Sequence, residues 1–163
     1  MPPSRKALVA QVSAALADLQ AVYDDRDQAL ADALGVNRTD LRCLDLIVRE
    51  GPQTASQLGA RLHLTRGSMT TLVDRLERAG YATRHDDPQH GRRKLVVPTA
   101  KLVDAITPLL APARQHGEAR LHKYGDGELR LVLDFLRTTH AAQDAVVESI
   151  RGTSNGDASQ RHP

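Results

Sequence analysis

Residues 54–81 read TASQLGARLHLTRGSMTTLVDRLERAGY and decide the fold of this 163-residue chain. Thr54, followed three residues later by Gln57, is a capping box, which predicts that a short helix begins here. A second helix is predicted from about Thr65 to Gly80, where glycine is a common stop. Its apolar residues recur at helical spacing, and they are Met69, Leu72, Val73 and Leu76. Two helices joined by a tight turn indicate a helix-turn-helix.

The next segment, residues 82–99, reads ATRHDDPQHGRRKLVVPT and predicts a basic hairpin. Two short strands, Tyr81 to His85 and Arg93 to Val97, flank a connection rich in turn-forming residues. The cations on or beside this connection are Arg84, His90, Arg92, Arg93 and Lys94. A basic hairpin directly after a helix-turn-helix is typical of a winged helix, whose wing lays arginine along or into the minor groove of DNA.

The positive charge of the chain is concentrated in its middle. Residues 37–101 hold twelve Arg or Lys and seven Asp or Glu, a net charge of +5, whereas residues 1–36 carry −2 and residues 102–163 carry −1. A solvated, arginine-rich surface is the alternative interpretation. Cations confined to the helix-turn-helix and hairpin are what phosphate neutralisation requires, so we expect double-stranded DNA as the partner.

The second helix of the pair presents small and hydrogen-bonding side chains opposite its apolar stripe. Such a face permits close approach to the major groove, although an ordinary solvated helix face has a similar composition. The basic hairpin decides between these readings in favour of DNA. The predicted DNA-binding residues are Ser56, Thr65, Arg66, Gly67, Ser68, Thr70, Thr71, Arg75, Arg84, His90, Arg92 and Arg93.

The remaining sequence predicts helices before and after this unit. A long helix spans about residues 4–34, and another follows the capping residue Asn37, with Leu41, Leu44, Ile47 and Val48 as its buried stripe. After Thr99 a further helix is interrupted by Pro108 and Pro112, each of which should bend or break it. A last helix follows Gly125. The fold class is therefore mainly α: a winged helix-turn-helix with long N- and C-terminal helices.

These terminal helices carry more apolar surface than a small winged helix can cover. We expect them to form a dimerisation region, residues 1–36 and 99–151, around the DNA-binding region of residues 37–98. A single-chain helical bundle is the alternative, but two-fold pairing reads a longer pseudo-palindrome. The whole is one structural domain, and the polar residues 152–163 form a disordered tail.

Several function classes are not supported by the composition. A single cysteine excludes an internal disulfide and suits the reducing cytoplasm, and no apolar run is long enough to span a membrane. The sequence also holds no metalloprotease, nucleophile-elbow or phosphate-loop motif. The densest cluster of metal-ligand types is His85, Asp86, Asp87 and His90, on a turn without fixed ligand geometry. We therefore expect no enzyme, cofactor or metal site; a winged-helix protein-interaction module is the remaining alternative.

Two stretches resemble the MarR family of transcriptional regulators: residues 54–84 and the DDPQHGRRKLVVPT of residues 86–99. In that family, LVDRLE followed by a glycine closes the recognition helix, and a DP-x-D-G-R run makes the wing tip. The resemblance extends over about residues 5–150. His90 stands where the family has an aspartate that orients the arginine matched by Arg92, so Arg92 loses its usual ionic partner.

The resemblance implies a homodimer that binds a near-palindromic operator, usually as a repressor, and is released by a small molecule, often an aromatic acid or phenol. The family pocket lies between the dimer helices and the DNA-binding unit. Tyr23 and Arg26 are candidates for binding an anionic aromatic ligand, or they form an exposed polar patch. Cys43 raises the alternative of a redox-responsive regulator. The reactive cysteine of the peroxide-sensing branch lies in the first helix, however, so Cys43 is better explained as a buried core residue.

Overall fold

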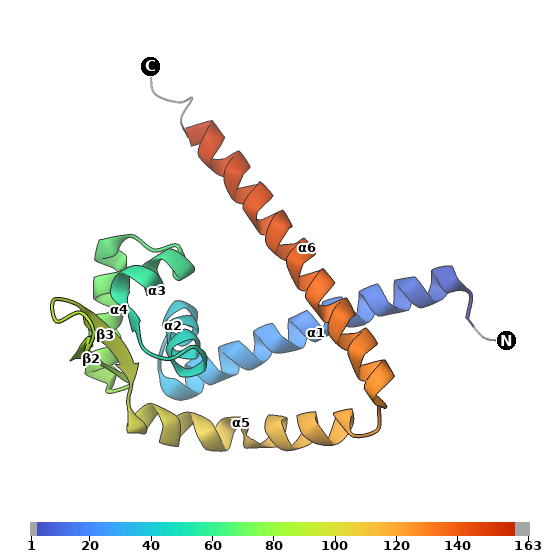
Figure 1. The fold of residues 1–163 in the computed structure, drawn as a ribbon, viewed down its shortest axis with the longest axis horizontal. Coiled ribbons are helices and arrows are strands. Elements are labelled where there is room, and N and C mark those ends of the chain that lie inside the picture. Colours follow the sequence, from blue (N-terminus) through green and yellow to red (C-terminus); the bar gives the residue numbers. More distant parts are fainter. Residues whose placement is uncertain (1–2, 159–163) are drawn as a thin grey trace. The chain divides into compact units, whose positions relative to one another are not determined.

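The computed structural model describes residues 3–158, apart from the side chains of residues 114, 118 and 152–158. The fold is mainly α with a small antiparallel sheet, as the sequence predicts (Figure 1). In chain order the elements are α1 (Arg5–Leu34), α2 (Arg38–Arg49), β1 (Gln53–Thr54), α3 (Ala55–Leu62), α4 (Arg66–Ala79), β2 (Ala82–Asp86), β3 (Lys94–Pro98), α5 (Ala100–Leu121) and α6 (Asp126–Ala158). The chain divides into two compact units, Met1–Ala111 and Pro112–Pro163.

Capping residues explain where the helices of the first unit begin. The side chain of Asn37 accepts a hydrogen bond from the Asp40 N–H at 2.8 Å, and the Thr65 hydroxyl accepts one from the Ser68 N–H at 3.2 Å. Thr54 and Gln57 form the predicted reciprocal capping box at the start of α3. Gly80 ends α4 in the left-handed region, with φ of 78°, a conformation that glycine adopts without a steric cost.

The turn between α3, which ends at Leu62, and α4, which begins at Arg66, packs closely against Gly59. A Cβ atom on Gly59 would lie 3.4 Å from the carbonyl oxygen of Leu64 and 3.7 Å from the Met69 side chain. His63 ends α3 in the left-handed region, with φ of 54°, and the next N–H, that of Leu64, donates to the Gly59 carbonyl at 2.9 Å. The turn is therefore closed by the left-handed conformation of His63 and by this backbone hydrogen bond.

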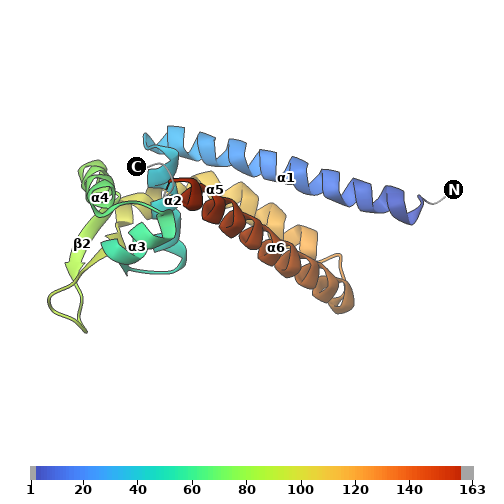
Figure 2. The same ribbon diagram turned by 90° about the horizontal axis from the view of Figure 1, so that it is seen from above.

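The sheet has three strands in the order β1-β3-β2, all antiparallel neighbours. The sequence predicts β2 and β3, but not the two-residue strand β1, which is too short to show a periodic pattern. In the register, Thr54 of β1 lies opposite Leu95, and Arg84 of β2 lies opposite Val96. Strand β1 thus ties the start of α3 to the first half of β3, and the turn of the hairpin projects from the unit (Figure 2).

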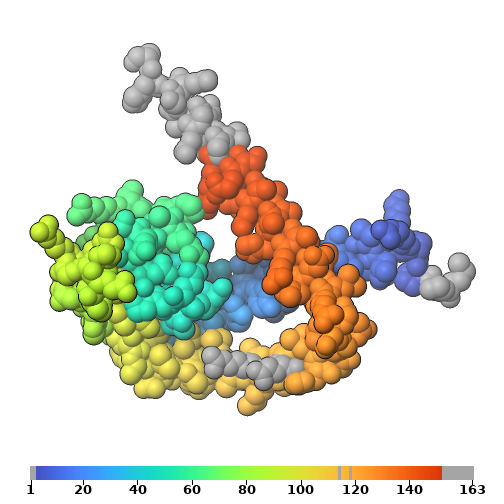
Figure 3. Space-filling view, viewed as in Figure 1, coloured from blue at the N-terminus to red at the C-terminus, as the bar shows by residue number. Residues whose placement is uncertain are grey.

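One core holds the first unit together. Leu44, Leu58 and Leu76, from α2, α3 and α4, are fully buried, and Leu102 in the first turn of α5 joins them. The space-filling view shows α2, α3, α4 and the hairpin as one continuous mass (Figure 3). Val48 is the exception to the expected stripe: it is 45% exposed, because the buried side of α2 runs through Cys43 and Ile47 instead.

The second unit consists of the end of α5 and α6. Neither Pro108 nor Pro112 ends α5, although the division between the units falls between Ala111 and Pro112. Among the described side chains of this unit none is buried, and many large apolar ones are exposed. Helix α6 continues to Ala158, into the segment that we expected to be disordered, and residues 159–163 lie outside the described residues.

None of the described helices combines the length and apolar character that a membrane crossing requires.

Candidate nucleic-acid interface

Helix α4 presents the side chains that the sequence assigns to the DNA-reading face. Met69, Leu72, Val73 and Leu76 are buried and fix the helix on the core. Arg66, Gly67, Ser68, Thr70 and Thr71 are exposed on the other side, as predicted. A Cβ atom on Gly67 would meet nothing within 4 Å, so glycine here leaves open space outside the helix. The apolar side of α4 is thus fixed on the core, and the opposite side is open to solvent.

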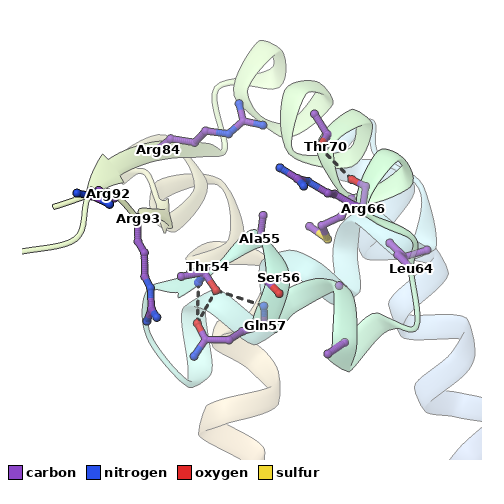
Figure 4. Close-up of a pocket in the computed structure, with 13 residues that line it drawn as sticks. Thr54, Ala55, Ser56, Gln57, Leu64, Arg66, Thr70, Arg84, Arg92 and Arg93 are labelled. Carbon is purple, nitrogen blue, oxygen red and sulfur yellow. Dashed lines mark hydrogen bonds between the residues drawn. The ribbon is translucent and has the colours of Figure 1, made fainter. Parts of the chain in front are cut away.

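A basic hollow lies between α3, α4 and the hairpin (Figure 4). Its volume is about 880 Å³, and its lining includes four arginines and no carboxylate: Arg66, Arg84, Arg92 and Arg93. Arg66 reaches from α4 toward the hairpin, and Arg84 reaches from β2 toward α4 (Figure 4). The predicted contacts Ser56 and Thr70 line the same hollow. The fold therefore gathers cations from three elements around one concave surface suited to an anionic chain.

Three of these arginines have no partner within the described part of the chain. The guanidinium groups of Arg66, Arg92 and Arg93 make no hydrogen bond or ion pair to any described residue. Their charges are consequently not cancelled by protein carboxylates and remain available to an anionic ligand. The loss of the family's usual wing acid at His90 agrees with the unpaired state of Arg92.

Arg84 behaves differently, because two carboxylates of α4 bind it. Its Nη2 donates to Asp74 at 2.7 Å, its Nη1 donates to Glu77, and its backbone N–H also donates to Glu77 at 3.0 Å. This contact clamps strand β2 onto α4. Arg84 is on the predicted list of DNA contacts and lines the basic hollow, and its ion pairs also fix the hairpin beside the helix.

The tip of the hairpin is held by Asp87 rather than by His90. The Asp87 carboxylate accepts a hydrogen bond from the Gln89 N–H at 2.9 Å, and the Asp87 N–H donates to the Arg93 carbonyl at 2.9 Å. The backbone of His90 completes the turn by accepting from the Arg93 N–H at 2.8 Å. The turn is therefore ordered by backbone bonds and one aspartate, in the absence of the family's usual wing acid.

A second hollow lies on the opposite flank of α4. Its volume is about 840 Å³. At about 100° per residue, Ser68, Thr71 and Arg75 point away from the side of Arg66 and Thr70, and they line this hollow together with the start of α2. Arg75 is bound there by Asp40, with Nε at 3.1 Å from one carboxylate oxygen and Nη2 at 2.6 Å from the other. The exposed crest of α4 thus runs between two hollows: three of the four arginines in the first are unpaired, whereas Arg38 and Arg75 in the second are both paired with carboxylates.

The sequence that forms this interface is similar to that of known proteins. The MarR family model matches residues 34–93, which run from the end of α1 through the helix-turn-helix to the turn of the hairpin. The HTH-type transcriptional regulator YcgE of Bacillus subtilis is 40% identical over 109 residues, which are 67% of this chain and 71% of YcgE. The chain belongs to the MarR family. It is a DNA-binding transcriptional regulator, in a family of regulators rather than enzymes.

Solved structures agree with the fold of this MarR-family regulator. A MarR family protein from Bacillus stearothermophilus has a TM-score of 0.61 at 20% identity, with 87% of this chain and 99% of that protein covered. The structure of the S. aureus MepR–DNA complex has a TM-score of 0.55 at 14% identity, with 81% and 98% covered. At these identities the likeness concerns the fold.

The two candidate ligand residues of this MarR-family chain form an exposed pair on α1. The Arg26 guanidinium stacks over the Tyr23 ring at 4.8 Å from its centroid, and it also binds Asp27 at 2.7 Å. Neither residue lines either hollow. Tyr23 is 49% exposed. In the single chain the pair is therefore a surface patch, and any pocket around it requires further protein surface.

Cys43 is fully buried in the first unit, as the sequence analysis favours. Burial, together with a smaller effect of the nearby Asp40 carboxylate, raises the pKa of its thiol from 9.0 to about 12. Since the thiolate is the reactive form, this environment opposes redox chemistry at neutral pH. The redox-responsive alternative finds no support in the geometry.

The hairpin does not assemble a metal site. Among the described residues, no group of three or more His, Cys, Asp or Glu side chains is arranged to hold a metal ion. Within the candidate cluster, Asp86 forms an ion pair with Lys94 at 2.6 Å, and Asp87 caps its own turn.

Sequence reasoning missed the carboxylates that bind the arginines, which are Asp40, Asp74 and Glu77. One signal for Asp40 was present. It precedes the buried Leu44 and Ile47 by four and seven residues, so it lies on the apolar stripe of α2. A carboxylate on such a stripe requires a buried cation partner, because an unpaired buried charge is costly. The identity of that partner, 35 residues along the chain, is set only by the fold.

Proposed function

We propose that this MarR-family regulator binds an operator in double-stranded DNA with the crest of α4 in the major groove and the hairpin along the adjacent backbone. The observation that carries the proposal is the basic hollow, lined by four arginines and no carboxylate, three of whose guanidinium groups are unpaired in the described chain. Phosphates neutralise such cations, and the small residues Gly67, Ser68 and Thr71 permit close approach to base edges. A complex of S. aureus MepR with DNA is among the similar structures, which supports DNA binding by this fold.

Salt dependence tests this proposal directly. Duplexes selected from a randomised pool would be titrated by fluorescence anisotropy over a salt series. Each unpaired arginine that neutralises a phosphate contributes about 0.9 to the slope of log affinity against log salt, so Arg66→Ala and Arg92→Ala should each reduce the slope by about that amount. Arg49→Ala is the matched control, since Arg49 pairs with Asp45 on α2 outside both hollows.

The wild-type result also separates this function from a protein-interaction module. A regulator of this kind would bind at low salt and lose affinity steeply as salt rises. Absence of DNA affinity at low salt, or affinity independent of salt, would contradict the proposal. Equal slopes for the wild type, Arg66→Ala and Arg92→Ala would remove these residues from the interface.

We further propose that the regulator acts as a homodimer on a near-palindromic site. In the described chain, Leu8, Val12 and Val22 of α1 are exposed, and so are Leu131 and Phe135 of α6, with Leu131 at 71%. Exposed apolar side chains in this number require a covering surface, and a second copy supplies one while placing two α4 helices on two half-sites. Such a regulator would work in the bacterial cytoplasm.

Sedimentation equilibrium tests the dimer. Leu131→Glu places a charge in the proposed interface, so we expect monomers and a large loss of operator affinity. Gln143→Glu introduces the same charge on the same helix at an exposed polar position and should leave the dimer intact. A monomeric wild type with full affinity for the selected duplex would contradict the dimer.

Repression and its relief by a small aromatic acid or phenol are proposed from the family resemblance. The stacked Tyr23–Arg26 pair offers an aromatic face and a cation, which suit an aromatic carboxylate. Titration of the protein–DNA complex with benzoate, for the wild type and Arg26→Gln, tests the assignment. Equal release of DNA from both proteins would exclude Arg26 as a ligand contact.

A further inference from the structure

The ion pair between Asp40 and Arg75 leaves part of the arginine unused. Asp40 accepts from Nε and Nη2, along one edge of the guanidinium group. Within the described chain, Nη1 has no hydrogen-bond partner, so the end of the group formed by Nη1 and Nη2 keeps free N–H donors. The Arg75 side chain is 40% exposed, whereas that of Asp40 is 4% exposed. The carboxylate is thus inside the protein and the free donors belong to a partly exposed group.

Asp40 holds Arg75 from a fixed position. It lies in the first turn of α2, and its N–H is bound by the capping side chain of Asn37 at 2.8 Å. The N-terminal turn of a helix is a favourable position for a carboxylate, so the helix supports Asp40 where it meets the guanidinium. Two hydrogen bonds from a planar fork to one carboxylate fix the orientation as well as the distance. Arg75 is therefore held in one orientation before any ligand arrives.

Arg75 shares its hollow with residues of the exposed face of α4. Ser68 and Thr71 line the same hollow and stand seven and four residues before Arg75, on the same side of the helix. If α4 enters the major groove, the donors of Arg75 enter beside them. An arginine that offers two donors at its end matches the O6 and N7 acceptors of guanine.

The paired state of Arg75 changes what it contributes to binding. An arginine with a carboxylate partner adds no net charge, so it adds little to the attraction for phosphates that every sequence shares. Its directed donors still distinguish one base from another. Arg66, Arg92 and Arg93 have the opposite character, since their charge is uncancelled and no described residue orients them.

We propose that Asp40 is a positioning residue that makes Arg75 a base-reading residue, by orienting its guanidinium group toward guanine and cancelling its charge. The proposal rests on the proposed function, because it assumes that α4 enters DNA. Asp40 then raises the ratio of specific to non-specific affinity in two ways at once: it strengthens one base contact and withholds one cation from unselective phosphate binding.

The test compares Asp40→Asn with Asp45→Asn, which removes the same charge from the same helix at an exposed position. Affinities for a selected duplex and for a scrambled duplex would be measured over a salt series. Relative to the control, Asp40→Asn should bind the scrambled duplex more tightly, with a salt slope steeper by up to about 0.9. The ratio of specific to non-specific affinity should fall by about tenfold, the loss of one oriented base contact.

Two outcomes would overturn the proposal. If Asp40→Asn matched Asp45→Asn in its ratio of specific to non-specific affinity and in its salt slope, Asp40 would have no role in base recognition. If Asp40→Asn lost affinity for both duplexes in parallel with an unchanged slope, its role would be confined to holding the fold together. The salt slope is the decisive readout, since a purely structural defect does not add a cation to the interface.

Arg75→Lys keeps the proposal testable should Asp40→Asn fold poorly. Lysine retains the charge beside Asp40, but its single ammonium cannot orient a fork toward two acceptors of guanine. We expect a folded protein with the wild-type salt slope, whose sites selected from a randomised pool lose their preference for one G·C pair. Unchanged base preference would overturn the inference while leaving DNA binding intact. Absence of salt-dependent binding by the wild type would instead contradict the proposed function itself.

Discussion

The arginines around α4 fall into two groups that differ in their neighbours. Arg75 and Arg84 are bound by carboxylates of α2 and α4, whereas Arg66, Arg92 and Arg93 have no such partner within the described chain. All five residues are arginines, and all five lie beside the proposed DNA surface. A paired arginine is held in one place by its carboxylate, as Arg84 is where it joins β2 to α4 and as Arg75 is beside α2, whereas an unpaired arginine keeps its full charge for a ligand. The comparison shows that a basic sequence overstates the number of charges that DNA would meet.

The largest effect on stability is expected from Arg75→Ala. It leaves the buried Asp40 carboxylate without its cation, and an uncompensated buried charge destabilises strongly. Because Arg75 is itself partly exposed, we expect a loss of about 2–3 kcal/mol in the free energy of unfolding, measured by urea denaturation. Arg49→Ala, which breaks an exposed ion pair, should cost under about 0.5 kcal/mol. Equal losses in the two variants would mean that the burial of Asp40 adds nothing to the stability contribution of its ion pair.

A smaller effect is expected from Arg84→Ala. Its partners Asp74 and Glu77 are partly exposed, so water replaces much of the interaction, and the loss should be about 1 kcal/mol. The hairpin should also loosen, because Arg84 joins β2 to α4. Amide hydrogen exchange in β2 and β3 measures this, and Lys94→Ala, which removes only an exposed pair with Asp86, serves as the control. Unchanged exchange in Arg84→Ala would mean that the clamp does not hold the hairpin.

Removing an unpaired arginine should have almost no effect on the free energy of unfolding. Arg66→Ala and Arg93→Ala remove no protein contact of the guanidinium group, so the free energy of unfolding should stay within about 0.5 kcal/mol of the wild type. The same variants should bind DNA several-fold more weakly, which the salt series measures. Loss of stability with unchanged DNA affinity would reverse the assignment of the two groups.

The smallest effect on stability at neutral pH is expected from the ionisation of the Cys43 thiol, which lies near Asp40. Its folded-state pKa is raised to about 12 from 9.0, so folding favours the protonated thiol. Its contribution to stability is therefore complete below pH 9 and is lost only as the pH rises toward 12. At pH 8 we expect no reaction with a thiol reagent until urea unfolds the protein. Rapid labelling of the native thiol would revive the redox-responsive alternative.

The domain boundaries predicted from the sequence remain a proposal about dimerisation. The winged helix shares its core with Ala31 and Leu34 at the end of α1 and with Leu102 in α5, so its packing extends beyond residues 37–98. The second unit, which consists of the end of α5 and α6, has no such core, since its described side chains are all at least partly exposed. Its exposed apolar residues recur at helical spacing, and the proposed second copy would cover them.

The sequence by itself determined the helix-turn-helix, the hairpin and the face of α4 that is exposed. These features depend on local signals: caps at Asn37, Thr54 and Thr65, stops at glycines, and apolar residues at helical spacing. Local signals act within a few residues, so they can be read along the chain. Only the tertiary structure decided which arginines are free, because Asp40 meets Arg75, and Asp74 meets Arg84, across distances in sequence that no periodic pattern spans. The charge of an arginine is fixed by its chemistry, but its availability to DNA is fixed by the carboxylate that the fold places beside it.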